Sequence, residues 1–194
     1  MKSDTVRGVI PTMIYHFLNE PEGLKKLKDE LTSIDIRNYN DLQQLPYLST
    51  CIYEMLRLHP PVPSTALRLA PPGGLVVAGK FIPEGTTIAT LQYSLFQDLN
   101  SFLIKVHLCP GLLVCDICLS RQGSFSKYGL GRFSCLGKSM SLMELRVAIA
   151  LILTNFNIDF TPGEYGSRMI AEISDCFTTA VGPMQVVMKA RTTE

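Results

Sequence analysis

The chain has 194 residues, 46% of them hydrophobic, and a formal net charge of +1. That length suits one domain or part of a larger one, and the near-neutral charge gives no indication of a nucleic-acid partner. Six cysteines at irregular spacing do not resemble the disulfide framework of a small secreted protein. We read no signal peptide at the start, and no run reaches the ~18 uninterrupted apolar residues of a membrane span.

The first forty residues predict two helices. Apolar side chains recur at helical spacing from the third residue to Phe17, and Asn19-Glu20-Pro21 ends this pattern because proline restrains the residue before it. Pro21 also suits the first turn of a second helix, which has leucines on one face. Taken alone, Ser3-Asp4-Thr5 is an N-terminal cap of the first helix.

Residues 46–58 predict a third helix with one apolar face, followed at once by His59-Pro60-Pro61-Val62-Pro63. Glu54 and Arg57 are three residues apart, so their side chains can pair. Such pairs on a protein surface contribute only ~0.3–0.5 kcal/mol. By default, we therefore interpret this pair as solvated.

Short strands and turns are predicted after this helix. Gly, Pro and β-branched residues indicate strands near 66–70, 75–77, 81–82 and 86–91, and a short helix follows over 92–97. Arg68 lies in the first of these strands. Without further context it is an arginine on an edge strand.

The next segment, residues 99–127, is largely apolar and carries four possible zinc ligands: His107, Cys109, Cys115 and Cys118. Structural zinc sites normally use two spaced ligand pairs with polar loops between them. Here the intervening residues are apolar, and a His-x-Cys pair is an awkward first half of such a site. The spacing therefore disfavours zinc.

The most distinctive stretch is residues 128–137, YGLGRFSCLG, with an amphipathic helix predicted over 138–155. Glycine tolerates positive φ and lets the backbone approach a bulky partner, and a helix N-terminus favours a thiolate. The arrangement would present the sulfur of Cys135 to a flat cofactor. A lone cysteine near a helix start is otherwise a small buried hydrophobe.

The last forty residues predict strands over 157–160 and 184–188, with Phe177 between them. A phenylalanine in such a position is by default a core residue. The helix over 138–155 carries an apolar stripe that we expect to pack in the core. This stripe consists of Leu142, Leu145, Ala148, Ile149, Ile152 and Leu153.

Four landmarks, in this order, resemble the cytochrome P450 superfamily in the form seen in many fungal members. They are Asp4-Thr5, Glu54-x-x-Arg57, the loop 128–137 and Glu144-x-Arg146. The resemblance implies a mainly α fold with a small β region, corresponding to the C-terminal half of the family's fold. It treats residues 1–194 as one partial domain.

That partial domain would have three parts: an oxygen-helix remnant through a β hairpin (3–98), an aberrant segment (99–122), and the cysteine loop with its helix and C-terminal strands (123–190). The loop differs in one respect from the common family pattern. Many members have arginine two residues before the cysteine, where this chain has Phe133, and its nearby cation is Arg132.

What the resemblance implies is haem-thiolate monooxygenase chemistry, typical of fungal secondary metabolism. The cofactor would be haem b, two electrons would come from an NADPH-dependent cytochrome P450 reductase, and one oxygen atom would be placed on a small organic substrate. Cys135 would be the axial ligand of the haem iron. Asp4 would relay protons, and Thr5 would hydrogen-bond the dioxygen.

The resemblance also implies supporting roles. Gly131, Arg132 and Gly137 would line the cofactor, and Arg68 would contact a haem propionate. Glu54 and Arg57 would be structural residues that support the haem pocket. Phe177 would lie on a turn that projects toward the substrate.

Residues 99–122 depart from the family, because no arginine there fits the third member of its Glu-Arg-Arg triad. We hypothesise that this segment comes from a frameshift or from intron read-through. A complete member is more than twice as long and sits on the endoplasmic reticulum membrane through an anchor that this sequence lacks. We therefore expect a poorly soluble, poorly active fragment.

The alternative to this interpretation is a protein without haem. It would be a non-enzymatic fragment, or a small metal-binding protein that uses His107, Cys109, Cys115 and Cys118.

Overall fold

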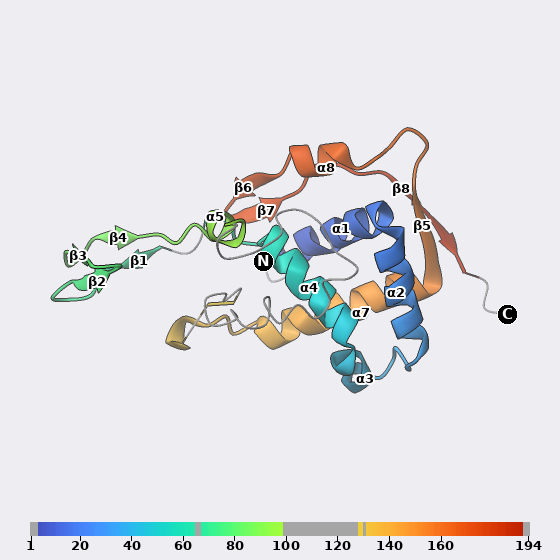
Figure 1. Cartoon of the computed structure of the whole chain (residues 1–194), viewed down its shortest axis with the longest axis horizontal. Helices are drawn as coiled ribbons and strands as arrows, with labels where there is room; N and C mark the ends of the chain where they lie inside the picture. Colours follow the sequence, from blue (N-terminus) through green and yellow to red (C-terminus); the bar gives the residue numbers. More distant parts are fainter. Residues whose placement is uncertain (1–3, 65–66, 99–127, 130, 192–194) are drawn as a thin grey trace.

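The structure is a computed structural model that describes residues 4–64, 67–98, 128–129 and 131–191 (Figure 1). These residues form a mainly helical body with four small antiparallel sheets, as the sequence predicts. The helices are α1 (Asp4–Asn19), α2 (Pro21–Thr32), α3 (Tyr39–Gln44), α4 (Pro46–Leu58), α5 (Gln92–Phe96), α7 (Lys138–Asn155) and α8 (Ser167–Ala171).

Each sheet of the described residues has two strands. The pairs are β1 (Arg68–Leu69) with β4 (Thr87–Ile88), β2 (Leu75–Val77) with β3 (Lys80–Ile82), β5 (Phe156–Phe160) with β8 (Val186–Ala190), and β6 (Ser174–Cys176) with β7 (Thr178–Ala180). Figure 1 shows β1 to β4 extending away from the helices, whereas β5, paired with β8, packs against α1 and α7.

The core lies where α1, α2, α4 and α7 meet (Figure 1). Each helix places apolar side chains there at intervals of three or four residues, as expected for helices with one buried face. Burial of one such side chain contributes roughly 1.5–3 kcal/mol. Fully or almost fully buried members are Met13, Phe17, Leu27, Leu48, Ile52, Met55, Leu145 and Ile149.

A carboxylate fixes the start of α4. Leu45, the residue just before the helix, makes no side-chain cap. Instead the two oxygens of Glu30, on α2, each accept a backbone N–H, from Tyr47 and Leu48, both at 2.8 Å. Because the first N–H groups of a helix have no intrahelical acceptor and favour negative charge, this contact ties α2 to α4.

Helix α1 contains Pro11 and does not end there. Proline removes one hydrogen bond from a helix interior, but the buried Thr12 hydroxyl donates to the carbonyl of Val9 at 2.7 Å and lies 3.3 Å from that of Gly8. Buried neighbours on both sides of this turn, Val9 and Met13, keep the helix in the core.

The predicted helix bounds at 46–58 and 138–155 are confirmed. Two predicted strands were too long: that at 66–70 is only Arg68–Leu69 among described residues, and that at 86–91 is only Thr87–Ile88. The short helices α3 and α8 were not predicted, because five or six residues do not establish a helical period.

Side chains on the extended strands are largely in solvent. Leu67, Leu69, Val76 and Phe81 are each more than 60% exposed. Among the described helices, none combines the length and apolar character needed to cross a membrane.

Candidate functional site

Cys135 lies in the turn that leads into α7. Its backbone N–H donates to the carbonyl of Tyr128 at 2.7 Å, and its own carbonyl accepts from the N–H of Lys138 at 3.3 Å. Gly137 precedes the helix, and its carbonyl accepts from Ser141 at 2.9 Å. The loop therefore folds back on itself and sets the sulfur beside the first turn of α7.

The thiol of Cys135 is exposed, so the alternative of a small buried hydrophobe is wrong. Gly131 has a φ of +59°, which favours glycine, and a Cβ added there would have no atom within 4 Å. Leu136, next to the cysteine, is fully exposed, and Met140 on α7 is 52% exposed. An accessible sulfur with apolar neighbours, in a loop that has free space at Gly131, fits a flat, apolar cofactor with a thiolate-bound metal.

Tyr128 anchors this loop to α7. Its hydroxyl accepts a hydrogen bond from Ser141 at 3.0 Å, and the Lys138 ammonium lies 5.9 Å from the centre of its ring. Burial raises the pKa of Tyr128, so the phenol stays neutral. The sequence analysis did not identify this anchor; an aromatic residue directly before a Gly-x-Gly run was the available signal.

Arg132 and Arg68 lie on different elements. Arg132 is exposed within the short 3₁₀ turn Gly131–Phe133, close to Cys135 in the chain. Arg68 is exposed on β1, where it donates to the carbonyl of Leu67 at 3.0 Å.

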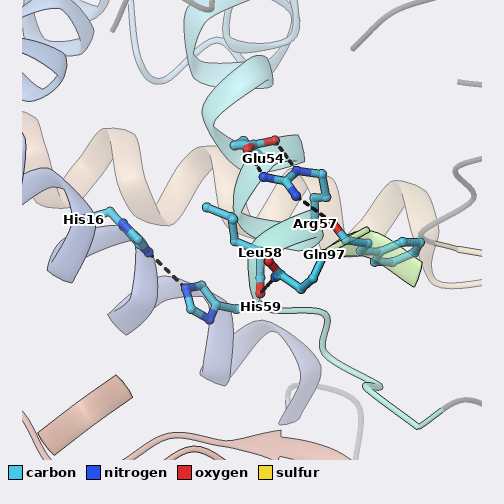
Figure 2. Close-up of polar contacts among 7 residues, drawn as sticks. His16, Glu54, Arg57, Leu58, His59 and Gln97 are labelled. Carbon is cyan, nitrogen blue, oxygen red and sulfur yellow. Dashed lines mark hydrogen bonds and ion pairs between the residues drawn. The ribbon is translucent and has the colours of Figure 1, made fainter. Parts of the chain in front are cut away.

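Glu54 and Arg57 form an ion pair on α4, shown in Figure 2, in which Arg57 is buried and Glu54 is 22% exposed. The Arg57 Nε donates to one carboxylate oxygen at 2.9 Å and an Nη donates to the other at 2.5 Å. The side chain of Arg57 is 3% exposed. Its other Nη donates to the carbonyl of Phe96 at 2.6 Å, and Gln97 donates to the carbonyl of Leu58 at 3.0 Å. These contacts join the end of α4 to α5.

Arg146, on α7, is the other buried arginine of the described residues. One terminal nitrogen lies 3.5 Å from the Tyr39 hydroxyl and the other lies 3.4 Å from the Ser49 hydroxyl, and its Nε has no hydrogen-bond partner among the described residues. Both contacts are at the outer limit for a hydrogen bond. Unlike Arg57, this cation has no carboxylate partner in the described part of the chain.

Two histidines, one on α1 and one at the C-terminal end of α4, lie in hydrogen-bond contact. The Nε2 atoms of His16, on α1, and His59, which ends α4, are 2.9 Å apart (Figure 2). Burial, and then the nearby charge of Arg57, lower the pKa of His59 to about 4. Sequence reasoning missed this contact because the two residues are 43 positions apart.

The N-terminal half of α1 packs closely on the β6–β7 hairpin. Thr5 is half-buried in the first turns of α1. One turn later, a Cβ added at Gly8 would lie only 3.1 Å from the carbonyl oxygen of Thr179 on β7. Thr179 in turn donates through its hydroxyl to Pro60 at 2.5 Å and through its N–H to Pro61 at 3.0 Å.

Phe177 sits at the turn between β6 and β7 and is 65% exposed, so it is not a core residue. Its φ is +73°, a conformation that costs roughly 1–2 kcal/mol for a residue with a side chain. The carboxylate of Asp175 accepts its N–H at 3.0 Å and supports this turn. The aromatic ring is thus held in solvent by a strained backbone.

The possible zinc ligands His107, Cys109, Cys115 and Cys118 lie outside the described residues, as does the segment 99–122 whose origin we question. In the parts of the chain that are described, no three His, Cys, Asp or Glu side chains are grouped to hold a metal ion.

Comparison with known proteins adds a family context. The family model described as Cytochrome P450 matches residues 3–103. Similar curated proteins include Cytochrome P450 monooxygenase notG' of Aspergillus versicolor (31% identical; 97% of this chain, 36% of the relative) and Cytochrome P450 67 of Uromyces fabae (33%; 83% and 32%). The chain thus spans about a third of the length of these relatives.

Among solved structures, the chain is similar to the heme domain of cytochrome P450DA, with a TM-score of 0.81. The match covers 97% of this chain and 41% of that one, at 18% sequence identity. A zebra fish cytochrome P450 bound to abiraterone matches with a TM-score of 0.82, also at 18% identity, over 98% of this chain and 44% of that one. At such identities the likeness concerns the fold alone.

Proposed function

This chain belongs to the cytochrome P450 family, and from that premise we propose that it is the cysteine-ligand half of a haem-thiolate monooxygenase. The observation that carries the proposal is the exposed Cys135 thiol, held at the start of α7 by the backbone of Tyr128. Residues 3–98 and 123–190 would be the two family-like parts of one partial domain, with 99–122 an aberrant insert between them.

We assign the cofactor as haem b with Cys135 as the axial ligand. Gly131 and Gly137 would leave room for the macrocycle, and the guanidinium groups of Arg132 and Arg68 would suit its propionates. When bound, the haem iron would supply the chemistry of dioxygen activation.

The chain's own residues would do the remaining work. Thr5 and Asp4, in the first turn of α1, would donate hydrogen bonds and relay protons to the oxygen substrate. The Glu54–Arg57 pair would hold α4 and α5 in place. Phe177, exposed on its strained turn, would contact the organic substrate.

Relatives indicate the substrate class. They include a tryprostatin B 6-hydroxylase of Aspergillus fumigatus (29% identical, 97% of this chain) and a pisatin demethylase of Fusarium vanettenii (34%, 84%). We infer a small organic substrate that is oxidised with O₂ and two electrons from an NADPH-dependent reductase at the endoplasmic reticulum membrane. Because the chain spans about a third of these relatives, we expect little activity from the 194 residues alone.

Spectroscopy of the purified chain with added haem tests the proposal. After reduction and exposure to carbon monoxide, a thiolate-ligated haem gives a strongly red-shifted Soret band. Wild type and Cys176→Ala, which removes another exposed cysteine, should show this band, and Cys135→Ala should lose it.

The same band in Cys135→Ala, or no haem binding by the folded wild type, would overturn the assignment. Zinc found by metal analysis of a chain without bound haem would instead favour the small metal-binding alternative.

A further inference from the structure

A pair of facing histidines joins α1 to the end of α4. The Nε2 atoms of His16 and His59 are 2.9 Å apart, and their ring centres are 5.2 Å apart (Figure 2). A hydrogen bond between two imidazole nitrogens needs one that carries a proton and one that does not. The two facing nitrogens therefore share a single proton when the bond is present.

The surroundings oppose a second proton on this pair. His16 is 6% exposed, and the ring of Tyr15 meets it edge-on at 5.1 Å between centres. Arg57, two residues before His59, adds a positive charge, which Glu54 partly compensates. Burial and this charge lower the pKa of His59 to about 4.

The described elements that pack on α1 and α4 carry the following polar and charged groups. The polar groups of α5 in this area are the Phe96 carbonyl and the Gln97 amide, which are neutral, and the short strand β7 consists of two threonines and an alanine. On α2, Glu30 contacts the opposite end of α4, and Lys26 lies 5.0 Å from the ring of Tyr47 there. On α7, Arg146 reaches Ser49, near the same distant end. Asp159, on β5, is exposed.

The histidine pair stands at a junction of three segments. His59 is followed directly by Pro60 and Pro61, whose carbonyls accept both hydrogen bonds of Thr179. Thr179 is two residues from Phe177, and its carbonyl packs against Gly8 of α1. A displacement of His59 relative to His16 would therefore move the Phe177 turn relative to the helix that carries Thr5.

We propose that His16 and His59 are positioning residues: with one proton shared by their facing Nε2 atoms they hold α1, residues 59–61 and the Phe177 turn together, and protonation of both Nε2 atoms releases the turn. This inference rests on the proposed function in one respect only: the surface around Phe177 is the side that would receive the organic substrate. Two protonated nitrogens that face each other would repel. If the rings separated, residues 59–61 would lose their fixed position, and the hydrogen bonds from Thr179 to Pro60 and Pro61 would no longer hold the turn in place.

The chain has no tryptophan, so Phe177→Trp places a single fluorescent reporter on the turn. Acrylamide quenching of this tryptophan is measured as the pH is lowered, with far-UV circular dichroism to mark global acid unfolding. The key variant adds His16→Gln and His59→Gln, because two amides can still donate and accept one hydrogen bond but do not titrate. His107→Gln, which removes the third histidine, is the matched control.

We expect quenching to rise in a step before global unfolding in the reporter protein and in its His107→Gln control, and the step to be lost in the double glutamine variant. The same step in the reporter protein, the His107→Gln control and the double glutamine variant would overturn the proposal. The absence of any step at a pH above that of global unfolding would overturn it as well. If the double variant does not fold, histidine NMR of the His107→Gln protein decides: two independent titrations near the ordinary pKa of ~6.5 would refute the shared proton.

None of these measurements uses haem. Their failure would leave the proposed role of Cys135 intact, and failure of haem binding would leave the histidine link intact.

Discussion

Replacement of Glu54 by glutamine should strongly destabilise the folded chain, because it removes the charge that compensates a buried guanidinium. Arg57 is only 3% exposed and donates to both oxygens of this carboxylate, at 2.9 and 2.5 Å. Breaking a fully buried pair by removal of one partner costs roughly 3–5 kcal/mol, and since the Glu54 side chain is 22% exposed we expect a loss at the lower end of that range. The free energy of unfolding of an ordinary domain is about 5–15 kcal/mol, so this loss would be a large fraction of the total.

The chain offers a matched control. Arg168 and Glu172 form another carboxylate–guanidinium pair at 2.8 Å, but their side chains are 66% and 47% exposed. Water already solvates both charges there. Glu172→Gln should therefore leave the urea midpoint unchanged, whereas Glu54→Gln lowers it markedly.

Urea unfolding followed by far-UV circular dichroism measures both variants. The double variant Glu54→Leu/Arg57→Met distinguishes the cost of an uncompensated buried charge from the cost of losing the ion pair itself. Because it removes both ions, it should recover most of the lost stability. A loss below about 1 kcal/mol for Glu54→Gln, the range of an exposed pair, would refute the argument that burial makes this pair important. Equal effects of Glu54→Gln and Glu172→Gln would refute it as well.

Three further predictions concern stability. Arg146→Met should leave the urea midpoint unchanged or raise it, because the Nε of this buried cation has no partner among the described residues. Gly166→Ala should lower the melting temperature more than Gly85→Ala: both glycines have positive φ, but an added Cβ would lie 2.5 Å from Tyr15 at the first and has open space at the second. In the folded chain the pKa of His59 is about 4, below its usual 6.5, so unfolding takes up a proton at pH values between the two. The free energy of unfolding should therefore fall by about 3 kcal/mol as the pH drops through this range, and His59→Gln should lack that part of the decline. A His59→Gln profile parallel to wild type would contradict the last prediction.

Local signals explain why α4 and α7 were predicted with the right bounds. Pro46 suits a first helical turn, and the prolines after His59 prevent continuation. Between these limits apolar residues recur with the helical period, and Leu48, Ile52 and Met55 are indeed buried. In α7 the same logic places Leu142, Leu145, Ile149 and Leu153 in the core, but Arg146 shares that buried face and was not expected there.

The contacts that shape the site could not be predicted in this way. These contacts are the hydrogen bond between His16 and His59, the capping of α4 by the Glu30 carboxylate, and the hydrogen bond from Ser141 to the Tyr128 hydroxyl. Each contact joins residues that are well separated in the chain, so no local spacing encodes it. The exposed thiol of Cys135 was an expectation from the loop motif, whereas its anchoring depends on a hydrogen bond to Tyr128, seven residues earlier, that no motif predicts.

X-ray absorption at the iron edge of the haem-loaded chain tests the central claim most directly, because it identifies the atoms bound to iron. We predict one sulfur ligand in wild type and in Cys176→Ala, and none in Cys135→Ala. Iron bound only by nitrogen and oxygen in the wild-type chain, or sulfur that persists in Cys135→Ala, would contradict the assignment of Cys135 as the haem ligand.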